Sequence, residues 1–323
     1  MVSAVIFVAT SCVSPLTGFA FWETNLAYEG ESIYNYLQVK NLSDRTILST
    51  NVLFGVQSVT MKDKGLTGMY YDTALAAPAL TDNANSALIL GMGTGTYARQ
   101  LKQYYPKMNI TGVEIDQKIT DLAGEYFDEP ADIPVTTYDG RAWLAASHDK
   151  YDVIMVDAYQ DITIPFQMSS TEFFTMVREH LNPGGVMVVN MNMISDGQGS
   201  INEALSDTIA SVFGNGNTLT ADVPNTTNRE LFAKKPGSGS EENSMQQASK
   251  ALNLRETTYE RTGSEDLEWY MEEVASRFRK VNEPDSASTI LTDDKAPVEV
   301  LGMHAIDQII ADEAGPYRQI LKD

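Results

Sequence analysis

A strand that runs into a glycine-rich turn and then a helix is the feature that most constrains this fold. Residues Ala87–Leu90 are apolar, glycine recurs at positions 91, 93 and 95, and a helical pattern begins near Tyr97. Glycine lets a backbone turn sharply and approach a ligand closely, and the following helix directs its first N–H groups at that ligand. The pattern predicts a ligand-binding turn at the carboxyl end of a buried strand.

Acidic residues follow the next two predicted strands. Glu114 and Asp116 end one of them, and Asp139 and Gly140 follow the other. An acidic residue about twenty positions after the first glycine suits the hydroxyl groups of a ribose. A turn of purely structural purpose would explain one strand end, whereas three strand ends of this chemistry predict a pocket for an adenosine-containing cofactor.

Adenosine cofactors differ in how well they suit this pocket. The dinucleotide motif G-x-G-x-x-G requires glycine at position 96, where this chain has Thr96, and a dinucleotide has no need of Asp139–Gly140. S-Adenosylmethionine and its decarboxylated form carry no pyrophosphate, so the turn needs less capacity to bind an anion. The sequence therefore favours an adenosyl sulfonium compound over NAD.

The negative net charge of the chain limits which classes of molecule it is expected to bind. The chain has 44 acidic and 23 basic residues among 323, which gives a formal net charge of −21. Such a charge repels nucleic acid, whose phosphates need basic patches, and attracts polycations such as polyamines, although it also serves solubility. One cysteine, Cys12, and three scattered histidines offer no disulfide and no ligand spacing, so we expect no metal site.

The N-terminal segment is apolar. Residues 1–22 contain no charged side chain, but Thr10, Ser11, Ser14 and Pro15 interrupt the apolar run before the ~20 residues that a membrane-spanning helix needs. Two interpretations stay open: the end of a membrane region, or an ordinary buried segment. We expect a cytoplasmic protein, tethered at the cytoplasmic face of a membrane if the first interpretation holds.

The order of predicted elements divides the chain into four parts. These are an apolar segment (1–24), a small antiparallel sheet (25–62), a Rossmann-like cofactor-binding domain (63–235) and a linker with C-terminal helices (236–323). Regular alternation over 86–192 predicts an α/β domain with a parallel sheet and helices on both faces. The expected elements are strands at 33–39, 46–48, 52–59, 87–90, 109–113, 133–138, 151–156, 186–189 and 229–233, and helices at 66–80, 97–104, 117–126, 141–147, 170–181, 201–213 and 264–279.

Motifs that follow in order along residues 31–190 carry a family resemblance. The chain resembles the spermidine synthase family of polyamine aminopropyltransferases. The family motifs E-S-x-Y-Q, D-G-x-x-Q, Y-H-E, V-E-I-D, D-G and Y-D-V-I-x-x-D correspond, unchanged or with substitutions, to Glu31–Asn35, Phe54–Gln57, Tyr70–Asp72, Val113–Asp116, Asp139–Gly140 and Tyr151–Asp157. The resemblance implies a class I S-adenosylmethionine-dependent transferase fold with a small N-terminal antiparallel β domain. The segment Leu291–Glu299 is more similar to a synthase-like subgroup, many of whose members follow membrane helices.

The chain departs from the family at positions that matter for chemistry. Thr94 stands where the family's glycine loop carries an aspartate that helps to hold the cationic aminopropyl end. The family loop D-S-S-D-P becomes Asp157-Ala158-Tyr159-Gln160-Asp161, so a strict count places Gln160 on the second aspartate and a one-residue shift places Asp161 there. Asn35 and Tyr71 replace a glutamine and a histidine.

Cofactor roles follow from the strand ends and from the resemblance. We assign Glu114 to the ribose hydroxyls and Asp139 to the adenine amino group, with Gln57 and Tyr70 facing the sulfonium side chain. Close backbone approach to the cofactor is expected at Gly91, Gly93, Thr94, Gly95 and Gly140.

Catalytic roles are assigned to the end of the fourth strand of the main domain. Asp157 would position the substrate, Asp161 would act as base, and Tyr159 is a third candidate. For each of them a role as a cap or turn residue is an equal alternative.

Three functions stay open on this sequence. The first is transfer of an aminopropyl group from decarboxylated S-adenosylmethionine to a polyamine, in a chain that we also expect to form a homodimer. The second is an S-adenosylmethionine-dependent methyltransferase, because Thr94 removes a charge that would repel the intact cofactor's carboxylate. The third is a non-catalytic module that binds a nucleoside or polyamine, which Gln160 and the apolar N-terminus favour.

Overall fold

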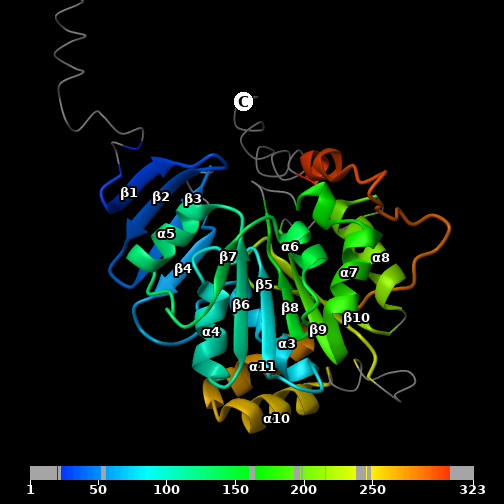
Figure 1. Cartoon of the computed structure of the whole chain (residues 1–323). Helices are drawn as coiled ribbons and strands as arrows, with labels where there is room; N and C mark the ends of the chain where they lie inside the picture. Colours follow the sequence, from blue (N-terminus) through cyan, green and yellow to red (C-terminus); the bar gives the residue numbers. More distant parts are fainter. Residues whose placement is uncertain are drawn as a thin grey trace, which may run out of the picture.

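The computed structural model describes residues 20, 23–51, 56–159, 164–192, 197, 199–214, 216–237, 245 and 249–305. Two β-sheets form its framework (Figure 1). The smaller sheet is antiparallel and its strands pair in sequence order: β1 (Leu26–Glu31), β2 (Tyr36–Asn41), β3 (Arg45–Thr50) and β4 (Ser58–Met61).

The larger sheet has eight strands in the order β12-β10-β11-β9-β8-β5-β6-β7. Their bounds are β5 (Ser86–Leu90), β6 (Asn109–Glu114), β7 (Val135–Thr137), β8 (Tyr151–Val156), β9 (Leu181–Met191), β10 (Thr218–Asp222), β11 (Arg229–Lys234) and β12 (Arg279–Lys280). Strands β7, β6, β5, β8 and β9 are mutually parallel. Beyond β9 the pairing is antiparallel: β11 pairs with β9, β10 with β11, and β12 with β10. The open parallel half places five strand ends at one edge, where ligands bind in such sheets.

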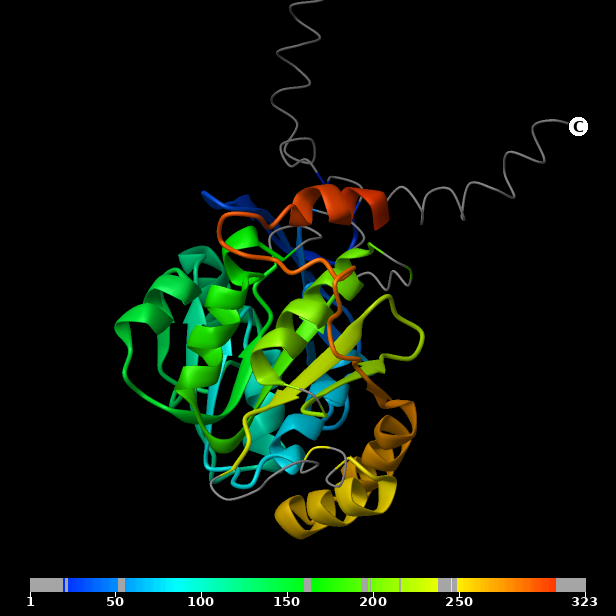
Figure 2. The same ribbon diagram turned by 90° about the vertical axis from the view of Figure 1, so that its right-hand side faces the viewer.

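Two groups of helices cover the two faces of this sheet. One apolar cluster joins the sheet to α2 (Tyr70–Ala74), α3 (Ala76–Leu80), α4 (Thr96–Tyr104), α10 (Ala251–Thr262) and α11 (Glu265–Arg277). A second cluster joins the other face to α6 (Gly140–Ala146), the 3₁₀ turn η2 (Phe166–Met168), α7 (Thr171–His180) and α8 (Ile201–Phe213). In Figures 1 and 2, α10 lies at the end of the molecule opposite the small sheet.

Helix α5 (Gln117–Tyr126) packs on the small sheet. Its Ile119 and Leu122 lie in one buried cluster with Leu37 of β2 and Leu48 of β3. The helix therefore fixes the small sheet next to the carboxyl end of β6.

The fold class expected from the sequence is confirmed, with one correction to the sheet. It is mixed instead of parallel, since the hairpin of β10 and β11 adds antiparallel strands beyond β9. Strands β1, β10 and β12 were not predicted: β1 alternates weakly in burial, three of the five residues of β10 are threonine or aspartate, and β12 has two residues. The four-part division of the chain stays a prediction, and residues 1–19 lie outside the described ones.

Two predicted elements near the small sheet begin later than expected. Ile33, placed in a strand by the sequence, is 90% exposed in a turn. Ser32 N donates to the Asn35 carbonyl and Asn35 N donates to Ser32 Oγ, so β2 starts at Tyr36. Of the strand expected at 52–59, residues 52–55 lie outside the described ones, and β4 begins at Ser58.

The helix expected at 66–80 is two short helices instead. The Asp72 carboxylate accepts hydrogen bonds from the N–H groups of Thr67 (2.9 Å) and Gly68 (2.6 Å), which holds a turn ahead of α2. Helix α3 then follows directly after Leu75. Among the described residues, no helix combines the length and apolar character that crossing a bilayer requires.

Asp152 connects three strands at the amino end of the parallel half of the sheet. Its Oδ2 accepts hydrogen bonds from the N–H groups of Asn85 (2.8 Å) and Ser86 (3.2 Å), and its Oδ1 accepts one from the Asn182 side chain (2.8 Å). The Asp152 side chain therefore joins the starts of β5, β8 and β9.

We predict that Asp152→Ala lowers the free energy of unfolding by about 2 kcal/mol, because the N–H groups of Asn85 and Ser86 and the Asn182 amide lose the buried carboxylate that accepts from them. Urea unfolding followed by circular dichroism measures the difference. Asp149→Ala, at an exposed neighbouring position, is the control and should change stability little. Equal effects of the two substitutions would contradict this role for Asp152.

Candidate active site

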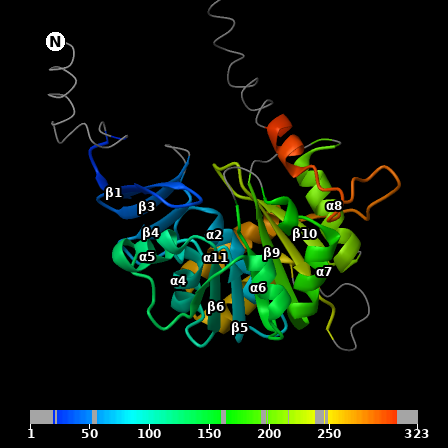
Figure 3. The ribbon, with the colours of Figure 1, turned by 45° about the horizontal axis from the view of Figure 1, so that its top comes forward.

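A cavity of about 350 Å³ lies at the carboxyl ends of the parallel strands, between the two sheets. Residues from the small sheet, such as Leu48 and Ser58, line one side, and Gly91, Glu114 and Asp157 of the large sheet line the other. Figure 3 shows the small sheet (blue) beside the ends of the central strands.

The glycine-rich turn joins the ends of three strands. The N–H groups of Gly91 and Met92 both donate to the Val113 carbonyl of β6, at 2.9 and 3.0 Å. Gly91 has φ +87°, and a Cβ atom there would lie 2.4 Å from the Asp157 carbonyl oxygen. Only glycine fits this position, because both the backbone angle and the contact with Asp157 exclude a side chain.

Glu114 is buried at the end of β6, where two backbone groups hold it. Its Oε2 accepts a hydrogen bond from Gly93 N (2.8 Å), and its Oε1 accepts one from Asp116 N (3.0 Å). Burial raises the pKa of the Glu114 carboxyl, against these hydrogen bonds that lower it. Each oxygen keeps a further lone pair that can accept from a ligand hydroxyl group.

Asp116 does not line this cavity but links its two walls. It caps α5 by accepting from Lys118 N, and it accepts hydrogen bonds from the side chains of Ser32 (2.6 Å) and Asn35 (3.1 Å). The turn between β1 and β2 is therefore tied to the end of β6.

Asp139 and Gly140 line the cavity at the start of α6. The Asp139 carboxylate caps this helix by accepting from Ala142 N at 2.7 Å. Tyr138, which is 56% exposed, and Pro165 line the same part of the cavity. The lining here therefore includes one aromatic ring, one proline and one carboxylate.

Asp157 lines the cavity at the end of β8. Its Oδ2 accepts a hydrogen bond from the Tyr70 hydroxyl (2.6 Å), and its Oδ1 accepts one from the Asn190 amide (2.9 Å). Burial raises the pKa of the Asp157 carboxyl to about 7, the two hydrogen bonds lower it, and the charge of Glu114 raises it. Such a carboxyl is suited to exchange a proton near neutral pH.

Tyr70 donates a hydrogen bond to Asp157 and keeps its own proton. It is buried on α2, and its ring lies 4.0 Å from that of Tyr71, measured between centroids. Burial and the neighbouring Asp157 charge raise the pKa of the Tyr70 hydroxyl well above its usual value, so it keeps its proton. The Tyr71 hydroxyl donates to the Gln57 carbonyl at 2.7 Å, which holds Gln57 in the cavity wall.

Thr94 and Gly95, expected to approach the cofactor, do not line the cavity. Thr94 is fully buried behind it, where its N–H donates to Ser58 Oγ (3.3 Å) and its carbonyl accepts from Arg99 (2.6 Å). Within the described residues, the Thr94 hydroxyl has no hydrogen-bond partner. Gly95 precedes α4 with φ +79°, so the turn bends away from the cavity after Gly93.

Of the three catalytic candidates, two lie at the cavity. Tyr159 lines it beside Asp157, and its hydroxyl donates to the Asn190 carbonyl and accepts from Asn192 N (3.2 Å). Through these hydrogen bonds Tyr159 stabilises the end of β9. Asp161, like Gln160, lies outside the described residues.

Asn190 is the site residue that sequence reasoning missed. It follows the predicted strand 186–189 directly, and the strand ends near Asp157, so its position was the available signal. Its amide donates to Asp157, while its side-chain oxygen accepts from Asn228 (2.8 Å). Among the described residues, no three His, Cys, Asp or Glu side chains gather closely enough to bind a metal ion.

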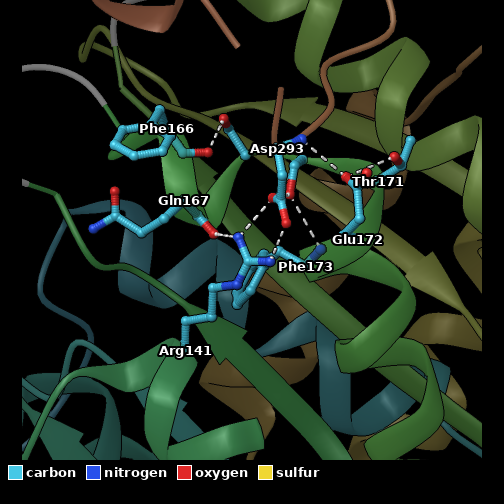
Figure 4. A network of polar contacts seen from close by, with 9 residues as sticks. Arg141, Phe166, Gln167, Thr171, Glu172, Phe173 and Asp293 are labelled. Atoms are coloured by element: carbon cyan, nitrogen blue, oxygen red, sulfur yellow. Dashed lines mark hydrogen bonds and ion pairs between the residues drawn. The ribbon is translucent and has the colours of Figure 1, made fainter. Parts of the chain in front are cut away.

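A network of polar contacts joins α6, the turn before α7 and the C-terminal segment (Figure 4). Arg141 of α6 donates to both oxygens of Asp293 (2.7 and 2.6 Å) and to the Gln167 carbonyl (2.7 Å). Asp293 also accepts from Ser170 Oγ (2.5 Å), and its own N–H donates to Glu172 (3.1 Å). The C-terminal segment thereby holds the turn before α7, whose Gln167 lines the cavity.

Comparison with protein families gives one match. The model of the spermine/spermidine synthase domain matches residues 69–235. These residues include the glycine-rich turn, Glu114, Asp139, Asp157 and β11.

Known proteins resemble the chain at two levels. It is 99% identical over all 323 residues to a protein of Bifidobacterium longum described as a probable polyamine aminopropyl transferase, 72% of which it covers. It is 28% identical over 209 residues to the polyamine aminopropyltransferase of Vibrio vulnificus, a match that spans 62% of this chain and 69% of that protein.

The fold itself is similar to that of solved synthases. The crystal structure of spermidine synthase from Thermotoga maritima superposes with a TM-score of 0.58 at 19% identity, over 80% of this chain and 85% of that one. At this identity the likeness concerns the fold.

We predict that Asp293→Asn lowers the free energy of unfolding at pH 7 by about 1 kcal/mol, since the pair is partly exposed. Arg141 holds the pKa of the Asp293 carboxyl below its usual value. The contribution is therefore present above the unfolded pKa of about 4 and is lost as the pH falls below it.

Urea unfolding of both proteins at pH 7 and at about pH 3.5 tests this prediction. Asp294→Asn, at the exposed neighbouring position, is the matched control. A difference between wild type and Asp293→Asn that stays the same at both pH values would contradict it.

Proposed function

The chain belongs to the spermine/spermidine synthase family, and we propose that it transfers an aminopropyl group from decarboxylated S-adenosylmethionine to a polyamine. The observation that carries the proposal is Asp157, a partly buried carboxylate that lines the cavity and is held by hydrogen bonds from Tyr70 and Asn190. The 99% identical relative, described as a probable polyamine aminopropyl transferase, supports the same reaction.

Charge in the cavity favours a donor without a carboxylate. The described lining contains the acidic residues Glu114, Asp139 and Asp157 and neither lysine nor arginine. Decarboxylated S-adenosylmethionine carries a sulfonium and an ammonium group, both of which such a lining stabilises. Intact S-adenosylmethionine would bring its carboxylate next to these acidic groups without a cation to pair with it.

Three parts of the cavity suit three parts of the donor. Glu114 has free lone pairs for the ribose hydroxyls, and Tyr138 and Pro165, which line the cavity together with Asp139, offer apolar contacts to the adenine ring. Gln57 and Tyr70 line the wall next to Asp157, where the sulfonium side chain would lie. Gly91 and Gly93 allow the donor to lie against the backbone between these parts.

The reaction needs alignment and the removal of one proton. The amine nitrogen attacks the methylene carbon beside sulfur, the C–N bond forms as the C–S bond breaks, and neutral methylthioadenosine leaves with the bonding pair. One proton leaves the attacking amine, and Asp157 is placed to accept it. The Tyr70 and Asn190 hydrogen bonds fix the orientation of this carboxylate.

Asp161 stays a further candidate for binding the amine or its proton, as the family loop implies. Tyr159 joins Asp157 to the end of β9 and acts as a positioning residue in this proposal.

We predict that the rate, as kcat/KM, rises with pH through about 7, because Asp157 accepts a proton only when it is ionised. Tyr70→Phe removes a hydrogen bond that stabilises the ionised form, so the pKa of Asp157 should rise by about one unit. The acidic limb of the profile should shift to higher pH by the same amount.

Methylthioadenosine formation from decarboxylated S-adenosylmethionine and putrescine, measured from pH 5.5 to 9, is the assay. Tyr104→Phe, outside the cavity on the same face, should leave the limb in place. Asp157→Asn should lower kcat about 100-fold or more. An unshifted limb in Tyr70→Phe would remove Asp157 from the role of base.

We predict that the protein binds decarboxylated S-adenosylmethionine at least about 10-fold more tightly than the intact form, because the acidic lining repels the carboxylate. Calorimetric titration with each compound measures the two affinities. Tighter binding of the intact form would overturn the proposal and support the methyltransferase alternative. Methylthioadenosine, the neutral product, is the reference for the contribution of adenosine alone.

A further inference from the structure

Glu230 of β11 lies in a row with the residues that form the base of the site. Glu230 is paired with Asn190 across the β11–β9 ladder, and Val156 is paired with Val189, which places Asp157 beside Asn190. Residues directly opposite on neighbouring strands lie on the same face of a sheet. Asp157, Asn190 and Glu230 are therefore successive members of one row across three strands.

The face that carries this row is the one under α2 and α4. Val188 and Phe232, two positions along from Asn190 and Glu230, belong to the apolar cluster that includes Tyr70 and Tyr97. Neighbouring strands are about 4.8 Å apart, so the backbones of Asp157 and Glu230 are separated by about 10 Å. Glu230 thus lies near the reacting groups but outside the cavity lining.

Glu230 has no group that stabilises its charge among the described residues. Its side chain is fully buried, and neither carboxylate oxygen accepts a hydrogen bond. The ionisable groups that act on it or respond to it are Asp157 at the end of β8, Tyr97 of α4 and Tyr159. A buried carboxylate in such surroundings is costly, so the free protein holds Glu230 in its neutral form.

Cations near β11 are engaged elsewhere. Arg229, the next residue, points to the opposite face and donates to Asp222 at 2.5 Å. Arg277 of α11 pairs with Glu273 at 2.9 Å and donates to the Asp222 carbonyl. Lys234 lies on the same face four residues along the strand, where it donates to the Leu80 carbonyl and to Asp82.

Hydrogen bonds distinguish the two acids of the row. Asp157 accepts from Tyr70 and Asn190, which favours its ionised form, whereas Glu230 accepts from neither. The charge of Asp157 makes ionisation of the buried Glu230 less favourable. One acid is therefore ready to carry charge and the other holds a proton, the arrangement by which environments separate neighbouring carboxyl groups.

We propose that Glu230 stores a proton which it releases to solvent when a cationic substrate binds beside Asp157, and takes up again when the products leave. The inference rests on the proposed function. Bound donor brings a sulfonium and an ammonium group into a cavity whose described lining has no lysine or arginine. At an effective dielectric constant of 20, each positive charge about 10 Å away lowers the pKa of a carboxyl by about one unit.

The step is a simple ionisation. The Glu230 carboxyl loses one O–H proton and becomes a carboxylate, and no other bond changes. The site then has negative charge on both Asp157 and Glu230, opposite the two positive charges of the donor. Glu230 is a positioning residue in this scheme, because it acts through its field and touches no reacting atom.

Proton-linked calorimetry tests this inference. Decarboxylated S-adenosylmethionine is titrated into the protein at several pH values between 7 and 9, in buffers of different ionisation enthalpy. Proton release should persist above pH 8, where Asp157 is already ionised, and Glu230→Gln should lose this component. Asp157→Asn, which keeps Glu230, should retain it.

Methylthioadenosine is the matched ligand, since it has the same adenosine but no positive charge, and it should release no proton. Equal proton release above pH 8 in wild type and in Glu230→Gln would overturn the inference. Absence of any binding heat with decarboxylated S-adenosylmethionine would instead count against the proposed function.

Infrared difference spectroscopy of the wild-type protein gives an answer that needs no variant. The band of a protonated carboxyl group should disappear when decarboxylated S-adenosylmethionine is added above pH 8 and persist when methylthioadenosine is added. A band that does not respond to the cationic ligand would contradict proton release.

Discussion

At the carboxyl end of the large sheet, the Asp157 N–H donates to the Leu90 carbonyl at 2.9 Å, and Gly91 lies directly against the Asp157 carbonyl. This contact brings the glycine-rich turn and the catalytic candidate to one point. It requires glycine at position 91, since a Cβ atom would come within 2.4 Å of that oxygen. The glycine-rich turn, which we propose binds the donor, and the strand that carries Asp157 therefore cannot move independently.

The second constraint on the site is the negative charge of its described lining, which contains no lysine or arginine. Glu114, Asp139 and Asp157 line the cavity, and each is held by hydrogen bonds from backbone or neutral side chains. Neutral donors orient a carboxylate without cancelling its charge, so the cavity keeps its attraction for a cationic ligand. The charged groups of the substrates are then part of the site's own electrostatic balance.

The sequence was sufficient for features that depend on local pattern. Buried strands followed by glycine or acid identified the ends of β5, β6 and β8, because each strand end is encoded in a few adjacent residues. Asn190 and Glu230 depend on strand register, which only the assembled sheet defines. The mixed sheet was missed for the same reason, since β10 and β11 form a hairpin whose pairing with β9 has no local signal.

Thr94 stands where the family's glycine turn carries an aspartate, so the turn of this chain lacks that charge. Thr94 is fully buried and outside the cavity lining, and its backbone N–H and carbonyl bond to Ser58 and Arg99. If the donor's ammonium group has no carboxylate on the glycine turn, its opposing charge must come from the strand ends. Asp157 lies at that position, and Glu230 lies one strand beyond Asn190 on the same face. An acid within the sheet has a fixed place in the register, so it can replace a charge on the turn without any change in the backbone around the donor.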